Sequence, residues 1–173
     1  MRRNSTQDIA LIGLLIALVA VATMAIKVPM PTAQGYIHLG DSMVFLTAVM
    51  FGRRKGAIAG GVGSALADLL LGYNQYVIPT LIIKGLMGFI VGAVADQESQ
   101  GLFNIRNILA FLVGAAVMAT GYMITNIIFY GDVPAALVGL VGDLIQSSMG
   151  AVIFIPIGMA LKKSDYFKNF VLK

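Results

Sequence analysis

Long hydrophobic runs separated by short polar segments extend along almost the whole chain. Most runs approach the roughly 20 apolar residues that a helix needs to cross a lipid bilayer, so the pattern predicts a bundle of transmembrane helices. The six expected spans cover about residues 8–28, 39–52, 56–72, 76–95, 107–130 and 134–161. The second span is short, which indicates either an earlier start near Tyr36 or a helix that its neighbours partly bury.

Composition supports this membrane class. Hydrophobic residues make up 58% of the 173 residues and charged residues 12%, against about 45–50% and about 25% in soluble domains. Six spans of about 20 residues use most of the chain, which leaves short loops and no room for a separate soluble domain. We therefore expect an all-α integral membrane protein, a six-transmembrane-helix bundle in which residues 1–173 form a single membrane domain.

The basic residues indicate which helix ends face the cytoplasm. Arg2 and Arg3 precede the first span, Arg53, Arg54 and Lys55 follow the second, Arg106 follows the fourth, and Lys162, Lys163, Lys168 and Lys173 follow the sixth. The intervening loops at residues 29–38, 73–75 and 131–133 contain no Lys or Arg. Because loops rich in these residues stay in the cytoplasm, both termini are expected there. Lys27 and Lys84 depart from this rule.

Three charged residues lie inside the apolar runs, in the half of the membrane that faces away from the basic loops. They are Asp68, Lys84 and Asp143. A charge at the centre of a membrane helix costs roughly 2.5–3.5 kcal/mol, so it persists where it pairs, binds a ligand or lines a wet cavity. Their one-sided placement indicates a binding pocket that opens on the outer surface. A structural ion pair of Lys84 with Asp68 or with Asp143 is the alternative, and both interpretations can hold together.

Other polar and aromatic residues lie at the same depth or in the outer loops. They are Asn126 and Gln146 within the helices, Tyr36, His38 and Asp41 in the first outer loop, and Tyr73, Asn74 and Tyr76 around the second. Tyrosine rings and amide groups suit stacking on, and hydrogen bonding to, an aromatic ligand. The loop at 28–41 is a candidate lid over the pocket. Anchoring of the tyrosines at the membrane interface is the alternative role.

Several classes of activity lack the residues that they need. The sequence contains no GxxxxGK[ST] motif, which excludes ATP hydrolysis through a P-loop in this chain. One histidine and no cysteine argue against a zinc site. His38 lies too close to Asp41 along the chain for a Ser-His-Asp arrangement. We therefore expect neither an enzyme nor a cofactor or metal site, and the dispersed basic residues do not form a nucleic-acid surface.

Small residues recur every four positions in three of the spans, which lets helix backbones approach closely in lipid. In the third and fourth spans, the rows within 52–64 and 88–92 are expected to pack inside the bundle. Gly13 and Ala17 form a similar row in the first span, which has almost no polar groups. That row is a candidate contact for a partner protein, with packing inside the bundle as an equal alternative.

Four segments in order carry a resemblance to a known family. They read GYIHLGDSMVFLTA, ALADLLLGY, PTLIIKGLMG and GDLIQSSMG. The chain resembles the substrate-binding S component of energy-coupling factor (ECF) vitamin transporters, in the subgroup for riboflavin, hydroxymethylpyrimidine or pyridoxine. The resemblance implies a vitamin site near the outer face of a prokaryotic cell membrane. It also implies a transmembrane coupling subunit and two ATP-binding subunits as partners, with the small-residue patch at Gly13 and Ala17 as the coupling contact.

The expected function is high-affinity vitamin binding for an ATP-driven importer. A small pocket with one lysine and two acids suits pyridoxine or hydroxymethylpyrimidine better than the larger riboflavin. A self-sufficient ion- or proton-coupled transporter that uses the three charges as a relay is the alternative, although the sequence shows neither inverted repeats nor broken helices. An assembly subunit would explain the small-residue rows but not three charges in the membrane.

Overall fold

The structure is a computed structural model that describes residues 5–29, 36–99 and 101–164. The described residues form six α-helices, which confirms the predicted helical fold. The elements are α1 (Ser5–Ala25), β1 (Lys27–Pro29), β2 (Tyr36–His38), α2 (Gly40–Phe51), α3 (Arg53–Leu71), the 3-10 helix η1 (Asn74–Tyr76), α4 (Val77–Val94), α5 (Ile105–Tyr130) and α6 (Val133–Lys163). Within these residues, four helices are long and apolar enough to cross a membrane, namely α1, α4 with η1, α5 and α6.

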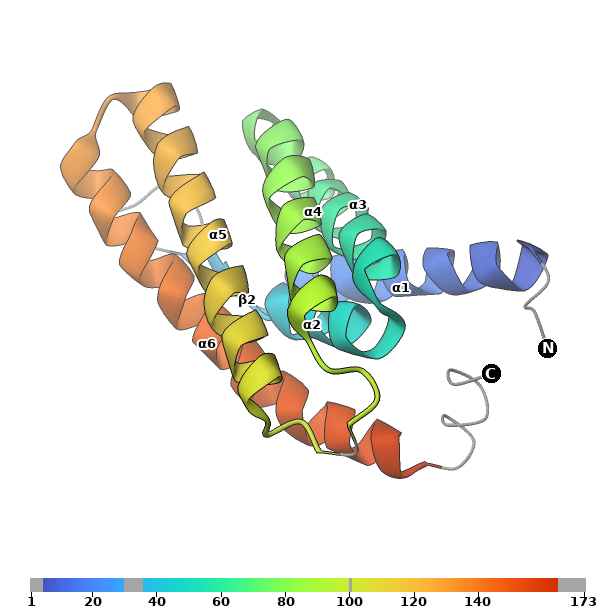
Figure 1. The fold of residues 1–173 in the computed structure, drawn as a ribbon. Helices are drawn as coiled ribbons and strands as arrows, with labels where there is room; N and C mark the ends of the chain where they lie inside the picture. Colours follow the sequence, from blue (N-terminus) through green and yellow to red (C-terminus); the bar gives the residue numbers. More distant parts are fainter. Residues whose placement is uncertain (1–4, 30–35, 100, 165–173) are drawn as a thin grey trace.

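Two antiparallel helix pairs and a central short helix organise the bundle (Figure 1). Helices α3 and α4 form one pair, α5 and α6 form the other, and α1 runs across the α3 side. Helix α2 packs against α1, α3, α4 and α6. Its 12 residues are nearly all buried, so α2 is covered by protein and does not need the length of a lipid-exposed span. Tyr36 belongs to a strand, so the expectation of a start near Tyr36 is wrong and burial by neighbours explains the short second helix.

Glycines allow α3 and α4 to pack with their backbones in contact. A Cβ added at Gly88 would lie 2.2 Å from the carbonyl oxygen of Gly56, and one added at Gly56 would lie 2.8 Å from the carbonyl oxygen of Gly88. No larger residue fits either position without separating the helices. The small-residue rows of these two helices therefore pack inside the bundle, as expected from the sequence.

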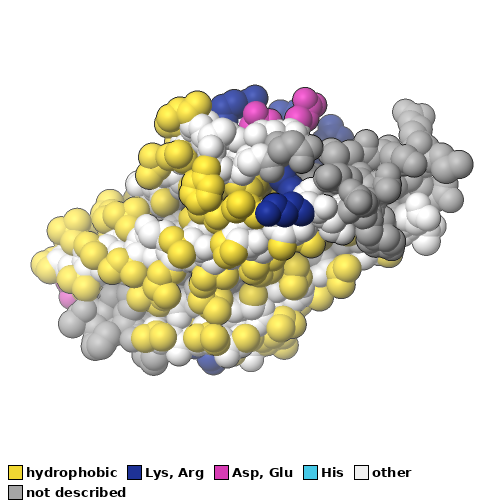
Figure 2. All heavy atoms as spheres, turned by 90° about the horizontal axis from the view of Figure 1, so that it is seen from below, with side chains coloured by type: hydrophobic (Ala, Val, Ile, Leu, Met, Phe, Trp, Pro, Cys, Tyr) yellow, Lys and Arg dark blue, Asp and Glu magenta, His cyan; other side chains and the backbone are white. Residues whose placement is uncertain are grey.

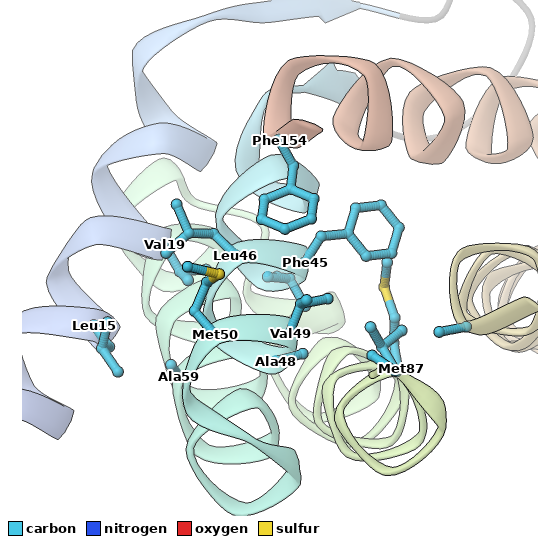
Figure 3. Close-up of a cluster of buried hydrophobic side chains, with 14 of the residues drawn as sticks. Leu15, Val19, Phe45, Leu46, Ala48, Val49, Met50, Ala59, Met87 and Phe154 are labelled. Carbon is cyan, nitrogen blue, oxygen red and sulfur yellow. The ribbon is translucent and has the colours of Figure 1, made fainter. Parts of the chain in front are cut away.

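The apolar core closes the bundle beneath the first turn of α2. Phe45 of α2, Met87 of α4 and Phe154 of α6 converge in this cluster (Figure 3). Phe111 of α5 joins them, with its ring centroid 5.0 Å from that of Phe45 and 5.8 Å from that of Phe154. These edge-on aromatic contacts join α2, α5 and α6, with α4 beside them, in one apolar cluster.

Large hydrophobic side chains also cover much of the outer surface, as Figure 2 shows for one face. Ile78 is 69% exposed, Ile128 is 73% exposed and Val152 is 68% exposed. Exposure of this kind on several helices suits contact with lipid rather than with water.

At one end of the bundle, basic side chains make polar contacts between neighbouring segments. These segments are the start of α1, the α2–α3 junction, the α4–α5 connection and the end of α6. Lys55 Nζ lies 2.8 Å from Asp8 Oδ1, and Lys162 Nζ donates to the carbonyl oxygen of Gln97 at 3.1 Å. Arg106 Nε donates to the carbonyl oxygen of Val94 at 3.2 Å. The described basic residues Lys55, Arg106 and Lys162 therefore lie at one end of the bundle, and their cytoplasmic location remains a prediction. Arg2, Arg3, Lys168 and Lys173 lie outside the described residues.

A short β-hairpin at the opposite end corrects the predicted end of the first helix. Helix α1 ends at Ala25 rather than near residue 28, because Lys27–Pro29 pairs antiparallel with Tyr36–His38. The connection at 30–35 lies outside the described residues. The other helix ends fall within about three residues of the predicted spans.

Candidate functional site

A pocket lies at the hairpin end, between β2, the end of α3, the start of α4, the end of α5 and the first half of α6. It contains about 490 Å³ of empty space, part of it open to solvent. Eight residues predicted from the sequence line it: Tyr36, His38, Asp68, Tyr73, Tyr76, Asn126, Asp143 and Gln146. Asn74 is exposed and is not among the lining residues, and Lys84 and Asp41 lie behind the pocket wall.

Three lining residues were missed by the sequence reasoning: Thr80, Tyr122 and Gly139. Each lies four residues from a predicted one on the same helix, and residues four apart share a helix face. Thr80 and Tyr122 face each other across α4 and α5, with their hydroxyl oxygens 2.9 Å apart. The positions four residues before Asn126 and Asp143 on the same helices could therefore have been predicted from the sequence as lining residues.

The partner of Lys84 differs from both predicted alternatives. Its ammonium group forms an ion pair and hydrogen bond with Asp41 Oδ1, and both side chains are fully buried. Sequence reasoning placed Asp41 in the outer loop, but it lies in the first turn of the buried helix α2. An acidic residue is favoured there by the helix dipole. Pairing with Asp68 or Asp143 is thus wrong, and the charge of Lys84 is neutralised beneath the pocket.

Gln146 connects this ion pair to the hairpin. Its Nε2 donates to Asp41 Oδ2 at 3.2 Å, and its Oε1 accepts from the backbone N–H of His38 at 2.9 Å. The backbone N–H of Gly40 donates to His38 Nδ1 at 3.0 Å. Burial, together with the charge of Lys84, lowers the pKa of His38 to about 3, so the ring is neutral at pH 7. The hairpin is therefore fixed to α6 and α2 by neutral hydrogen bonds.

A second hydrogen bond attaches the hairpin to α3. The hydroxyl of Tyr36 donates to Asp68 Oδ1 at 3.0 Å, and burial beside that carboxylate raises the pKa of Tyr36 above its ordinary value. The Tyr36 ring also lies 4.8 Å from that of Tyr73, centroid to centroid. This aromatic pair covers one side of the pocket, next to a carboxylate.

The remaining polar groups lie on α5 and α6. Tyr76 donates through its hydroxyl to Asn126 Oδ1 at 2.6 Å, which leaves the amide N–H₂ of this lining residue available as a donor. Asp143 is buried in the pocket wall. Tyrosine rings, amides and carboxylates around one cavity suit the binding of a planar polar molecule.

Comparison with known proteins provides the family context. The model of the family described as "ECF-type riboflavin transporter, S component" matches residues 3–163. An uncharacterised protein of Pyrococcus woesei is 41% identical over 146 residues, which covers 84% of this chain and 95% of that protein. The thiamine precursor transporter HmpT of Lactococcus lactis is 27% identical over 171 residues, or 98% of this chain and 96% of the relative. A UPF0397 protein of Streptococcus agalactiae is 29% identical over 182 residues and covers 98% and 94%.

Proposed function

Because the chain belongs to the S-component family of ECF-type transporters, we propose that it is the high-affinity substrate-binding subunit of an ATP-driven vitamin importer. Its family makes it a multi-pass membrane transport protein rather than an enzyme. The pocket between the hairpin and four helices is the observation that carries the proposal, because it offers aromatic, amide and carboxylate groups at one end of the bundle.

The orientation proposed here puts this pocket on the outer side of a prokaryotic cell membrane. Lys55 and Lys162 lie at the other end of the bundle, and basic segments favour the cytoplasm. All six helices would then cross the membrane, with both termini inside. Among the described residues, the buried apolar cluster that includes Phe45, Met87 and Phe154 contains none of the pocket residues.

Transport would require partners. The sequence has no P-loop, so ATP hydrolysis belongs to two separate ATP-binding subunits, which act through a transmembrane coupling subunit. The proposed contact with that subunit is the small-residue row at Gly13 and Ala17 on α1. Both residues are exposed, and a Cβ added at Gly13 would meet no atom within 4 Å.

The proposed substrate is a small hydroxylated heteroaromatic vitamin or precursor, of the pyridoxine or hydroxymethylpyrimidine type. The printed name of the Lactococcus relative, a thiamine precursor transporter, supports a compact ring of this kind. Four tyrosines at the pocket provide surfaces for a single ring, and the Asn126 amide provides a donor for a ring nitrogen or hydroxyl.

The test is ligand identification followed by reconstitution. The full chain, purified alone in detergent, should retain a vitamin that mass spectrometry of the denatured sample identifies, and titration calorimetry should measure its affinity. Liposomes containing the chain alone should not accumulate that vitamin, whereas liposomes with the coupling and ATP-binding subunits and ATP should. Accumulation by the chain alone, driven by an ion gradient, would refute the proposal in favour of a self-sufficient transporter.

A further inference from the structure

The charges of the pocket do not balance among the described residues. Asp68 and Asp143 both line it, and no Lys or Arg does among the residues that the structure describes. The one lysine buried nearby, Lys84, already pairs with Asp41. Lys27 of the hairpin is exposed and does not line the pocket, and the connection at 30–35 contains no charged residue. The pocket therefore favours a ligand with positive charge or several hydrogen-bond donors.

Asp143 is the carboxylate without a protein partner. It is 8% exposed, and it makes no hydrogen bond or ion pair within residues 5–29, 36–99 and 101–164. Asp68, in contrast, accepts from the hydroxyl of Tyr36. Buried carboxylates are normally paired or hydrogen-bonded, because removal from water without a partner is costly. A partner from the ligand would satisfy Asp143.

The other polar groups of the wall restrict the kind of partner. Both polar atoms of the Gln146 amide are already hydrogen-bonded, because Nε2 donates to Asp41 and Oε1 accepts from the backbone N–H of His38. Asn126 has its oxygen occupied by Tyr76 and keeps its N–H₂. The Asp143 carboxylate and the Asn126 N–H₂ are thus available to a ligand, and they complement a ring with donors on one edge and an acceptor elsewhere.

We propose that Asp143 anchors an aminopyrimidine, or a similar heterocycle with an amino group next to a ring nitrogen. This proposal rests on the function proposed above and narrows its substrate class. The amino group and the adjacent protonated ring nitrogen donate in parallel to the two carboxylate oxygens, a charge-assisted bidentate arrangement. The ring nitrogen of pyridoxine has no neighbouring donor, so it supplies one such bond. Carboxylated vitamins and phosphate esters are repelled by Asp68 and Asp143.

The experiment uses titration calorimetry on the full purified chain with four probes. They are 4-amino-5-hydroxymethyl-2-methylpyrimidine, its 4-oxo analogue, its phosphate monoester, and pyridoxine. The amino compound should bind at least about tenfold more tightly than each of the others, since one charge-assisted hydrogen bond corresponds to about 10–150-fold in affinity. Equal affinity for the amino and 4-oxo compounds, or a preference for pyridoxine, would overturn the proposal. If none of the probes nor any co-purified vitamin binds a chain that still assembles with its partners, the function proposed above fails as well.

Variants of Asp143 provide the second measurement. Asp143→Asn should weaken binding of the amino compound by about 10–150-fold and change binding of the 4-oxo compound little, while Asp143→Glu should restore most of the preference. Glu98→Gln is the matched control, because Glu98 is exposed in the connection between α4 and α5. An unchanged preference in folded Asp143→Asn would refute the assignment. If that variant does not fold, the four probes on the unmodified chain still decide the proposal.

Discussion

At the scale of single residues, the buried charges have two different roles. Lys84 and Asp41 pair with each other, and other acids face the pocket. Both side chains of the pair are fully buried beneath the pocket. Removing one member of such a pair leaves an uncompensated buried charge, which typically costs about 3–5 kcal/mol. Lys84 and Asp41 therefore act on the stability of the bundle, whereas Asp68 and Asp143 face the cavity.

This difference predicts the behaviour of Lys84→Met. The variant should lower the midpoint of thermal unfolding strongly in detergent, and adding Asp41→Asn should recover much of the loss, because the double variant removes both buried charges. Differential scanning fluorimetry of the two variants measures the effect. A normal midpoint for Lys84→Met with lost vitamin binding would instead make Lys84 a ligand contact.

Sequence reasoning located most of the pocket but not this pair. Asp68 and Asp143 stand out because each is a charge within an apolar run. Asp41 and Lys84 are 43 residues apart, and their contact depends on how α2 packs against α4, which no local pattern records. The hairpin was missed for a related reason, since strands of three residues such as Tyr36–His38 show no detectable periodicity.

At the scale of elements, the hairpin is held over the pocket by side chains from two helices. Gln146 accepts from the backbone of His38, and Asp68 accepts from Tyr36. These bonds attach the strand to α6 and α3. The expected role of the 28–41 segment as a lid therefore depends on the strength of these two hydrogen bonds.

Gln146→Leu tests that attachment. The change leaves the N–H of His38 and Asp41 Oδ2 without their partner, and such losses typically cost about 1–3 kcal/mol. Amide hydrogen exchange at 36–38 should accelerate by about 5–150-fold, as followed by mass spectrometry. The neighbouring exposed Ser148→Ala is the control and should leave the hairpin unchanged. Unaltered protection in Gln146→Leu would show that the strand pairing alone holds the hairpin.

The α3–α4 contact allows a sharper comparison between two glycines of one helix. Gly88→Ala would place a Cβ 2.2 Å from the carbonyl oxygen of Gly56, whereas a Cβ at Gly85 lies 3.6 Å from its nearest neighbour, the carbonyl oxygen of Ala57. We expect Gly88→Ala to destabilise the protein by about 1–3 kcal/mol from overpacking. Gly85→Ala should be neutral or slightly stabilising, because alanine favours helix by up to about 1 kcal/mol. Similar thermal midpoints for the two variants would contradict backbone contact at Gly88.

At the scale of the whole molecule, the pocket and the exposed face of α1 lie on different elements, so ligand binding and partner coupling should be separable. Ala17→Phe should prevent close approach of a partner helix, and it should leave the vitamin affinity unchanged. Co-purification with the coupling subunit and vitamin uptake by cells should both fall. Ala116→Leu on α5 is the matched control, a small-to-large change at another exposed position. Intact complexes with impaired vitamin binding would place the partner surface elsewhere.

The burial of α2 also bears on how the protein is made. Asp41 emerges from the ribosome well before Lys84, so during synthesis the carboxyl group at the start of α2 has no counterion. Because Lys84 of α4 is the partner of Asp41 in the structure, we expect α2 to reach its buried place after α4 has entered the membrane. A nascent chain halted before α4 should therefore keep α2 at the membrane surface or within the insertion machinery, and completion of the fourth helix sets the order in which the bundle closes.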